Sequence, residues 1–220
     1  MSLLEKIPAE SALITAELQQ QITTIFSKLD KKVRLVAILD ETEEKSLELG
    51  SFLEVISNCS EQLELELHAK GECPDKETEL HAQHLPVVGI YGDTYTGAAF
   101  HGVPGGKEIN SFIAAIGNYG GAGQPLDKRL KKNIEKIQKP MNLKIFVSLA
   151  CHHCPLVVAA CQKIAIANPF VTAEMYDAKL YEDIVQKYKV ERVPMVVVNE
   201  EQVIMGQKSI EEMVNRLMNM

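Results

Sequence analysis

The feature that most constrains this 220-residue chain is an order of strands and helices that occurs twice. The repeat has a period of about 100 to 110 residues. Strands that alternate with helices predict crossover connections, and a hairpin before the last helix of each half makes the predicted sheet mixed. We therefore expect an α/β protein of two duplicated folds, each a mixed four-stranded sheet flanked by helices. The other interpretation is one large α/β domain whose repeat is accidental.

The elements of each half follow from hydrophobic periodicity and from turn residues. In the first half we expect helices at 3–28, 43–57 and from 107 onward, and strands at 33–39, 63–69, 85–92 and 97–102. In the second half we expect helices at 127–138, 154–168, 178–188 and 209–220, and strands at 143–149, 170–177, 193–199 and 202–206.

The halves also share prolines and glycines at corresponding strand ends. Pro86 and Pro194 each open a third strand, and Gly102 and Gly206 each end a fourth. The Gly-rich stretch YGGAGQP at 119–125 reads as the joint between the halves. We therefore predict one domain over residues 1–120 and a second over residues 121–220.

Composition excludes several classes of protein. No run approaches the roughly 20 apolar residues that a membrane helix needs, and the N-terminus does not read as a secretory signal. A net charge of -7 argues against a nucleic-acid partner, which would require a basic face. Five cysteines, an odd number, do not describe a disulfide scaffold. We expect a cytoplasmic protein with no membrane and no nucleic-acid partner.

The motif with the clearest chemistry is CHHC at 151–154, directly after a predicted strand and at the start of a predicted helix. Two cysteines three apart on a helix lie on neighbouring turns of one face, close enough for a disulfide. Cys151 is expected at the helix N-terminus, where free N–H groups and the helix dipole stabilise a thiolate. Cys154, one turn deeper, is expected to resolve the mixed disulfide formed by Cys151.

Residues around the motif support this chemistry. His152 and His153, when protonated, favour the thiolate of Cys151 further. Val193-Pro194 is expected to be a cis peptide, with the Val193 backbone facing the disulfide and pairing with an extended partner segment. Arg192 adds positive charge beside it.

Two other interpretations of the motif remain. A structural zinc site needs four converging ligands, and only Cys151 and Cys154 are placed to serve. Inert buried thiols are the third possibility. Cys161 is expected in the core, Cys59 at a helix end and Cys73 in a loop, and the other four histidines in solvated or packed positions.

The first half carries DETEEK at 40–45, after its first strand, where the second half carries the cysteines. It therefore cannot exchange disulfides at that position. The order of elements, with Cys-x-x-Cys after the first strand and a proline before the third, resembles the thioredoxin layout. An inactive copy followed by a copy with Cys-His-x-Cys-Pro is similar to the N-terminal domain of the bacterial alkyl hydroperoxide reductase flavoprotein subunit.

The matching stretches are SLACHHCPLVVAA, IAIANP, VERVPMVVVNEE, FHGVPGGKEINSFIAAI and GGAGQPL, spread over most of the chain. By this resemblance, Glu108 matches a buried acid near the dithiol, which would raise a thiol pKa and accept protons during exchange. The alternative for Glu108 is an acid placed at a helix start by the helix dipole. His153, and Arg192 where the family typically has Gly, depart from the pattern, so redox potential and partner choice are not carried over.

The resemblance implies an electron relay. The domain would take electrons from a flavin- and NADH-dependent reductase module, in the same chain or a separate one, and pass them to a two-cysteine peroxiredoxin. FAD and NADH would belong to that module, and this chain would bind no cofactor and no metal. A stand-alone protein disulfide oxidoreductase and a zinc-binding or interaction module are the alternatives.

Overall fold

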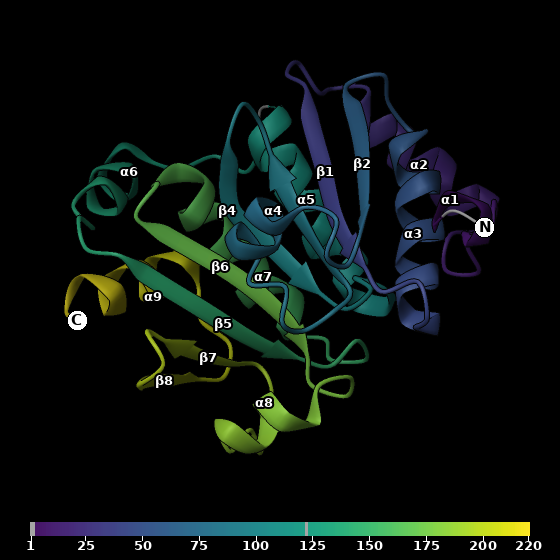
Figure 1. The fold of residues 1–220 in the computed structure, drawn as a ribbon. Helices are drawn as coiled ribbons and strands as arrows, with labels where there is room; N and C mark the ends of the chain where they lie inside the picture. The colour runs from purple at the N-terminus through teal and green to yellow at the C-terminus, as the bar shows by residue number, and fades with distance from the viewer. Residues whose placement is uncertain (1–2, 122) are drawn as a thin grey trace.

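The computed structural model describes residues 3–121 and 123–220 and contains one eight-stranded mixed sheet, in the order β2-β1-β3-β4-β6-β5-β7-β8 (Figure 1). The first four strands come from the first half of the chain and the last four from the second. The expected fold class is therefore confirmed, and the two four-stranded sheets join edge to edge. Among the described residues, no helix is long and apolar enough to cross a bilayer.

The first half contains each expected strand, with small changes at the ends. Its strands are β1 (Val33–Leu39), β2 (Leu63–Ala69), β3 (Val87–Tyr91) and β4 (Tyr95–His101). Its helices are α1 (Leu3–Lys6), α2 (Ala16–Phe26), α3 (Glu44–Ser57), α4 (Pro74–Glu79) and α5 (Ile109–Gly120), preceded by the 3-10 turn η1 (Gly106–Glu108).

The second half repeats the plan. Its strands are β5 (Met141–Val147), β6 (Val171–Asp177), β7 (Met195–Val198) and β8 (Gln202–Met205). Its helices are α6 (Lys128–Glu135), α7 (Cys154–Ala167), α8 (Glu182–Lys187) and α9 (Ile210–Met218).

Two expectations for the first half were wrong. The single helix at 3–28 is two helices, because Pro8 interrupts the pattern and Thr15 caps a new helix by accepting a hydrogen bond from the Leu18 N–H at 3.2 Å. The stretch between β2 and β3 contains the short helix α4, which no hydrophobic period signals because none of its residues is buried.

The halves join where β4 pairs with β6 in parallel, from Ala98↔Ala173 to His101↔Tyr176. Gly97 has a φ of +84°, and a Cβ there would lie 2.5 Å from the Val171 carbonyl oxygen. Only glycine allows the two strands to approach so closely at this point.

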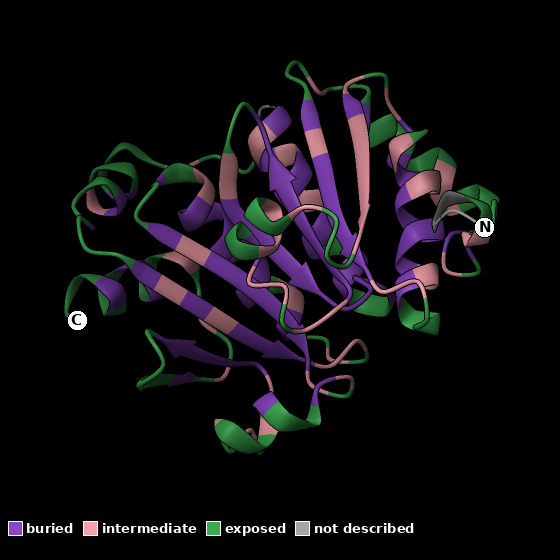
Figure 2. Ribbon diagram, viewed as in Figure 1, coloured by how far each residue is buried: buried purple, intermediate pink, exposed green. Residues whose placement is uncertain are grey.

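The two faces of the sheet are covered differently. Helices α3, α5 and α7 pack on one face, with α2, α6 and α9 packed against them, whereas α4 and α8 lie on the other (Figure 1). Six of the eight strands are buried along most of their length, whereas β2 is mostly half-buried and β8 is mostly exposed (Figure 2). The face covered by α3, α5 and α7 holds the large apolar core, and the face covered by α4 and α8 holds two smaller apolar clusters.

The division into domains 1–120 and 121–220 stays a prediction. The predicted boundary falls where α5 ends, at Gly120. Within the predicted joint at 119–125, residue 122 lies outside the described residues. The sheet continues across the halves, so they form one layer rather than two separate bodies.

Candidate active site

The two motif cysteines lie where β5 leads into α7, and they form a disulfide with their Cα atoms 5.6 Å apart. Helix α7 begins at Cys154, so Cys151 lies in the turn that leads into the helix, just before the N-terminus at which the sequence analysis expected it. That turn is closed by a hydrogen bond from the Cys151 N–H to the Ser148 carbonyl at 2.8 Å. Cys154 is fully buried, whereas Cys151 is half-buried and is therefore the more accessible of the two cysteines.

The backbone of the first helical turn reaches the outer sulfur. The Cys154 N–H donates a hydrogen bond to the Cys151 Sγ at 3.2 Å. Pro155, in the same turn, lacks an N–H but stands where helical N–H groups have no intrahelical partner. The site is therefore built to favour negative charge on Cys151, which is the property a nucleophilic cysteine needs.

The side chains next to the dithiol are open to solvent. His152 and His153 are exposed, and Leu156 exposes 56% of its surface although it is a large apolar residue. The surface next to the dithiol therefore combines an exposed apolar side chain with two exposed imidazoles.

Pro194 lies at the same end of the sheet as the dithiol. Met195 pairs with Phe146 across β7 and β5, only a few residues before Cys151 in the chain. The Val193-Pro194 peptide is cis, as the sequence suggested. Pro194 is buried, Val193 is half-buried and Arg192 is exposed.

Glu108 reaches this site from the other half of the chain. The Lys107 N–H donates to the carbonyl of Leu149 at 2.9 Å, and a Cβ on Gly106 would lie 2.6 Å from the same oxygen. The turn η1 therefore lies against the segment that leads to Cys151. This contact brings the expected proton acceptor beside the dithiol region.

The Glu108 carboxyl is fully buried, and its Oε1 has no hydrogen-bond partner among the described residues. The Ser111 hydroxyl is within hydrogen-bond distance of its Oε2. Burial raises the pKa of Glu108 to about 7, against the opposing effect of Ser111, and the charge of Asp177 raises it further. Glu108 therefore titrates near neutrality, where a proton acceptor is most useful.

Asp177 was not singled out from the sequence. It ends β6, faces Val147 at the end of β5, and is 9% exposed. Burial raises its pKa, against the backbone N–H and the charge of Lys179 and the charge of Lys45. The sequence does show an acid at the end of this strand. Its closeness to the dithiol can be recognised only once the strand order is known.

The other cysteines fall where expected. Cys161 is fully buried in α7, and burial raises its pKa to about 12. Cys59 is buried just after α3, and Cys73 is half-buried before α4. In residues 3–121 and 123–220, no three His, Cys, Asp or Glu side chains are grouped to hold a metal ion.

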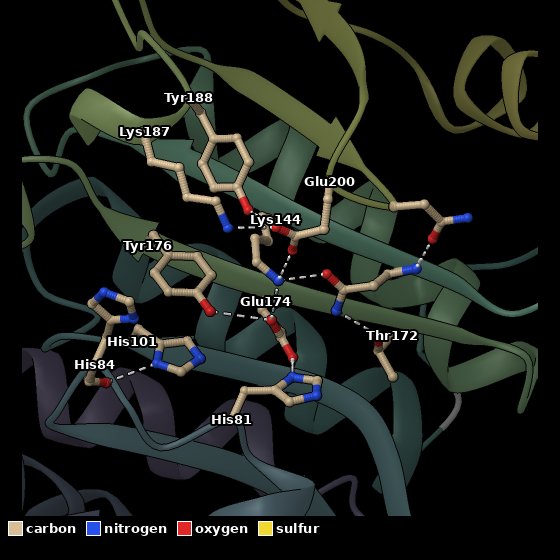
Figure 3. Close-up of polar contacts among 12 residues, drawn as sticks. His81, His84, His101, Lys144, Thr172, Glu174, Tyr176, Lys187, Tyr188 and Glu200 are labelled. Carbon is tan, nitrogen blue, oxygen red and sulfur yellow. Dashed lines mark hydrogen bonds and ion pairs between the residues drawn. The ribbon is translucent and has the colours of Figure 1, made fainter. Parts of the chain in front are cut away.

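A second polar group lies on the opposite face of the sheet and joins the halves (Figure 3). Glu174 on β6 has no exposed surface and bonds to His81 Nδ1 of the first half. The Tyr176 hydroxyl donates to Glu174 at 3.2 Å, and Lys144 Nζ lies 3.8 Å from it. Lys144 also pairs with Glu200 at 2.9 Å.

The remaining histidines near Glu174 are also packed. His84 pairs with Asp183 at 2.9 Å, and His101 stacks on Tyr176 with ring centroids 4.2 Å apart. Burial lowers the pKa of His101 to about 4. The sequence indicated solvated or packed histidines, and it carried no sign that three of them meet at the junction of the halves.

Comparisons with known proteins agree with this geometry. A thioredoxin domain family model matches residues 141–219. The N-terminal domain of the alkyl hydroperoxide reductase AhpF from Enterococcus faecalis superposes with a TM-score of 0.88 and 42% identity, covering 93% of this chain and 99% of that one. A protein disulfide oxidoreductase from Aeropyrum pernix superposes with a TM-score of 0.85 at 18% identity, over 93% and 92% of the two chains, so it supports the fold alone.

Among curated proteins, the alkyl hydroperoxide reductase AhpF of Staphylococcus aureus strain Mu50 is 29% identical over 93% of this chain. The chain spans 38% of the length of that relative. The sequence identity and the fold point to the same family. The chain belongs to the family of AhpF N-terminal domains and is a thiol-disulfide oxidoreductase of the thioredoxin fold.

Proposed function

We propose that this chain carries electrons from a flavin- and NADH-dependent reductase module to the disulfide of a two-cysteine peroxiredoxin, in the removal of hydroperoxides. The observation that carries the proposal is the Cys151–Cys154 disulfide, with its outer sulfur held by the first amide of α7, in a chain 42% identical to an AhpF N-terminal domain. The name of these relatives, alkyl hydroperoxide reductase, supports the hydroperoxide pathway.

The exchange takes place in two substitutions at sulfur. The Cys151 thiolate attacks one sulfur of the partner disulfide, forms a mixed disulfide and releases one partner thiolate, which takes a proton from water. Cys154 then loses its proton, attacks the Cys151 sulfur and releases the second partner thiolate. Two electrons pass from the dithiol to the partner, and Cys151 and Cys154 end as a disulfide.

Glu108 receives the proton that Cys154 loses in the second substitution. A buried thiol holds its proton strongly, so an acceptor with a pKa near 7 is better matched to it than an exposed carboxylate is. The released proton returns to solvent after the partner leaves.

The partner is oriented by residues at the edge of the site. Val193 precedes the first β7–β8 pair, Met195↔Met205, so its backbone is outside the ladder and can pair with an extended segment. His152, His153 and Arg192 add exposed polar contacts around it. Pro194 fixes the position of this backbone.

The electron donor is a reductase module in the same polypeptide or a separate one. FAD and NADH bind to that module, and this chain contributes its dithiol alone. We place the reaction in the cytoplasm, where thiols stay reduced.

The test is a single-turnover assay with the full chain reduced by dithiothreitol and freed of excess reductant. We expect one equivalent of oxidised two-cysteine peroxiredoxin to be reduced, with Cys151 and Cys154 becoming disulfide-bonded. Cys151→Ser is expected to be inactive, whereas Cys154→Ser is expected to trap a mixed disulfide. Cys161→Ser, a buried thiol outside the site, is the matched control and keeps activity.

Failure of the wild-type protein to reduce peroxiredoxin would overturn the proposed partner. Equal rates with insulin and peroxiredoxin would instead support a general protein disulfide oxidoreductase. An active Cys151→Ser protein would show that the attacking residue is wrongly assigned.

A further inference from the structure

Three parallel strands end together at the dithiol. β4, β6 and β5 run in the same direction, because β4 pairs with β6 in parallel and β6 with β5 in parallel. Their carboxyl ends therefore lie at one edge of the sheet. The chain continues from β4 to Glu108, from β5 to Cys151, and β6 ends at Asp177.

The side chain of Asp177 faces the helices that carry the dithiol and Glu108. Side chains alternate along a strand, and Tyr176 packs in the apolar cluster on the α4 and α8 face. Met175 packs in the large core on the other face, so Asp177 lies on that side too. A Cβ on Gly102, at the end of β4, would lie 3.3 Å from the Asp177 Cβ, which places Asp177 against the segment that leads to Glu108.

We propose that Asp177 is a positioning residue for the exchange at Cys151 and Cys154: its carboxylate, buried at the same edge of the sheet and against the segment that leads to Glu108, strengthens Glu108 as the proton acceptor for the thiol. The proposal rests on the proposed role of Glu108 in exchange. Asp177 belongs to the half with the dithiol and Glu108 to the half without it, so the pair also gives the half without the dithiol a part in the chemistry.

The physical basis is the interaction of two acids in a space with little water. Like charges that share a desolvated site cannot both ionise freely, so each raises the affinity of the other for a proton. The pKa of each of these carboxyls is raised, first by burial, and the charge of Asp177 contributes to the shift of Glu108.

The groups around the pair decide which acid keeps the proton. The Glu108 carboxyl bonds to Ser111 on α5, and η1, which carries Glu108, packs against α7. Facing Asp177 are Lys45 at the start of α3 and, in the loop after β6, Lys179 and Tyr181. The Lys179 N–H donates to Asp177 Oδ1 at 3.1 Å. The positive charges lie on the Asp177 side, so Asp177 is the ionised member and Glu108 takes the proton.

The proton balance follows from this assignment. In the second substitution the S–H bond of Cys154 breaks and an O–H bond forms on Glu108, while the electron pair left on sulfur makes the Cys151–Cys154 bond. The Cys151–partner bond breaks and its electron pair leaves on the partner sulfur. Asp177 keeps its charge throughout, and this charge makes the O–H bond on Glu108 more favourable.

The first test measures the proton affinity of Glu108 without any exchange reaction. The oxidised full chain, with 13C-labelled Asp and Glu carboxyls, is titrated by NMR, and Glu108 is assigned by its absence in Glu108→Gln. In Asp177→Asn we expect the Glu108 midpoint to fall by about half a pH unit or more, since a neighbouring negative charge is removed. Asparagine keeps an oxygen that can accept the Lys179 N–H, and exposed Asp93→Asn is the matched control with no expected shift.

An unchanged Glu108 midpoint in folded Asp177→Asn would overturn the proposal. Should that variant not fold, the wild-type titration decides. If the two acids are coupled, the chemical shift of each carboxyl changes in two steps, one for its own titration and one for that of its neighbour. Two independent curves with a single step each would overturn the proposal.

The second test is the pH profile of single-turnover reduction of a small aromatic disulfide. For Asp177→Asn we expect the acidic limb to move to lower pH and the plateau rate to fall, because the acceptor is weaker. In the Glu108→Gln background, Asp177→Asn is expected to have no further effect on the profile. A merely structural role of Asp177 would lower the rate without moving the acidic limb of the pH profile. Equal effects of Asp177→Asn in the wild-type and Glu108→Gln backgrounds would overturn the proposal. Because the titration needs no peroxiredoxin, failure here and failure of the proposed partner are distinguishable.

Discussion

The backbone N–H of Cys154 lies 3.2 Å from the Sγ of Cys151 and donates to it while the two sulfurs are bonded to each other. The donor belongs to the first residue of α7, so it is fixed by the helix rather than by a mobile side chain. A donor already in place when charge develops costs no reorganisation during the reaction. The same bond is therefore available to the thiolate once the disulfide is reduced.

We expect the pKa of Cys151 in the reduced protein to lie below the free value of about 8.5, because the N–H and the helix dipole stabilise the thiolate. The measurement is the rate of iodoacetamide alkylation against pH in Cys154→Ser, which keeps the backbone N–H. The same protein unfolded in guanidinium is the control and returns to the free value. A folded-state midpoint at or above 8.5 would contradict the assignment of Cys151 as the attacking thiol.

Glu108 makes the stability of the protein depend on pH. Its pKa is about 7 when folded and about 4.3 when unfolded, so its contribution is fully present below about pH 4 and is lost as the pH rises through 7. Glu108→Gln removes this loss. We expect the stability of the variant relative to wild type to increase by about 3 kcal/mol between pH 4 and pH 8.

Urea unfolding at several pH values measures the effect of Glu108→Gln. Glu201→Gln, at an exposed position in the turn between β7 and β8, serves as the control and should leave the pH dependence unchanged. If the free energy of unfolding changed with pH in the same way for wild type and Glu108→Gln, ionisation of the buried carboxyl would not destabilise the folded protein.

His81 links the halves through buried Glu174, and this link should weaken at high pH (Figure 3). The hydrogen bond that His81 makes to Glu174 raises the pKa of the imidazole, so its stabilising effect is complete below about 6.5 and is lost as the pH rises through the higher folded value. Because the imidazole is 45% exposed, we expect His81→Ala to cost about 1 kcal/mol near pH 6 and less at pH 9.

The same unfolding experiment tests the His81 link, with His152→Ala as the exposed control. A cost for His81→Ala that is equal at both pH values would show that the imidazole contributes packing rather than charge.

Gly97→Ala should weaken the junction between β4 and β6. The added Cβ would meet the Val171 carbonyl at 2.5 Å, and the φ of +84° disfavours any residue with a Cβ, so we expect a loss of about 2 kcal/mol or more. Gly117→Ala is the matched control: it lies within α5, and apart from its neighbours in the helix no atom lies within 4 Å of the new Cβ, so it should stabilise the protein by about 0.5 to 1 kcal/mol. Thermal unfolding of both variants decides, and a neutral Gly97→Ala would mean that the strands can separate there without cost.

Features that depend on neighbouring residues could be predicted well. The apolar run at Val33–Leu39 and the alternating pattern at Leu63–Ala69 are strands with the expected ends, because both patterns depend on consecutive residues. The Cys-x-x-Cys spacing likewise implied a disulfide, since three residues of chain alone bring the sulfurs within reach. Hydrophobic periodicity gave the wrong prediction at residues 3–28 and missed α4. At both places a cap or a proline outweighed a weak periodicity.

By itself, the sequence determined the duplicated α/β plan and the dithiol, because both depend on short-range spacing and hydrophobic period. Only the tertiary structure decided that β4 lies beside β6, that Asp177 therefore lies near Glu108, and that His81 meets Glu174 across the junction. The physical reason is that such contacts join residues about 70 to 90 positions apart. Their pairing depends on strand order and on close packing at glycines such as Gly97, which no local pattern encodes.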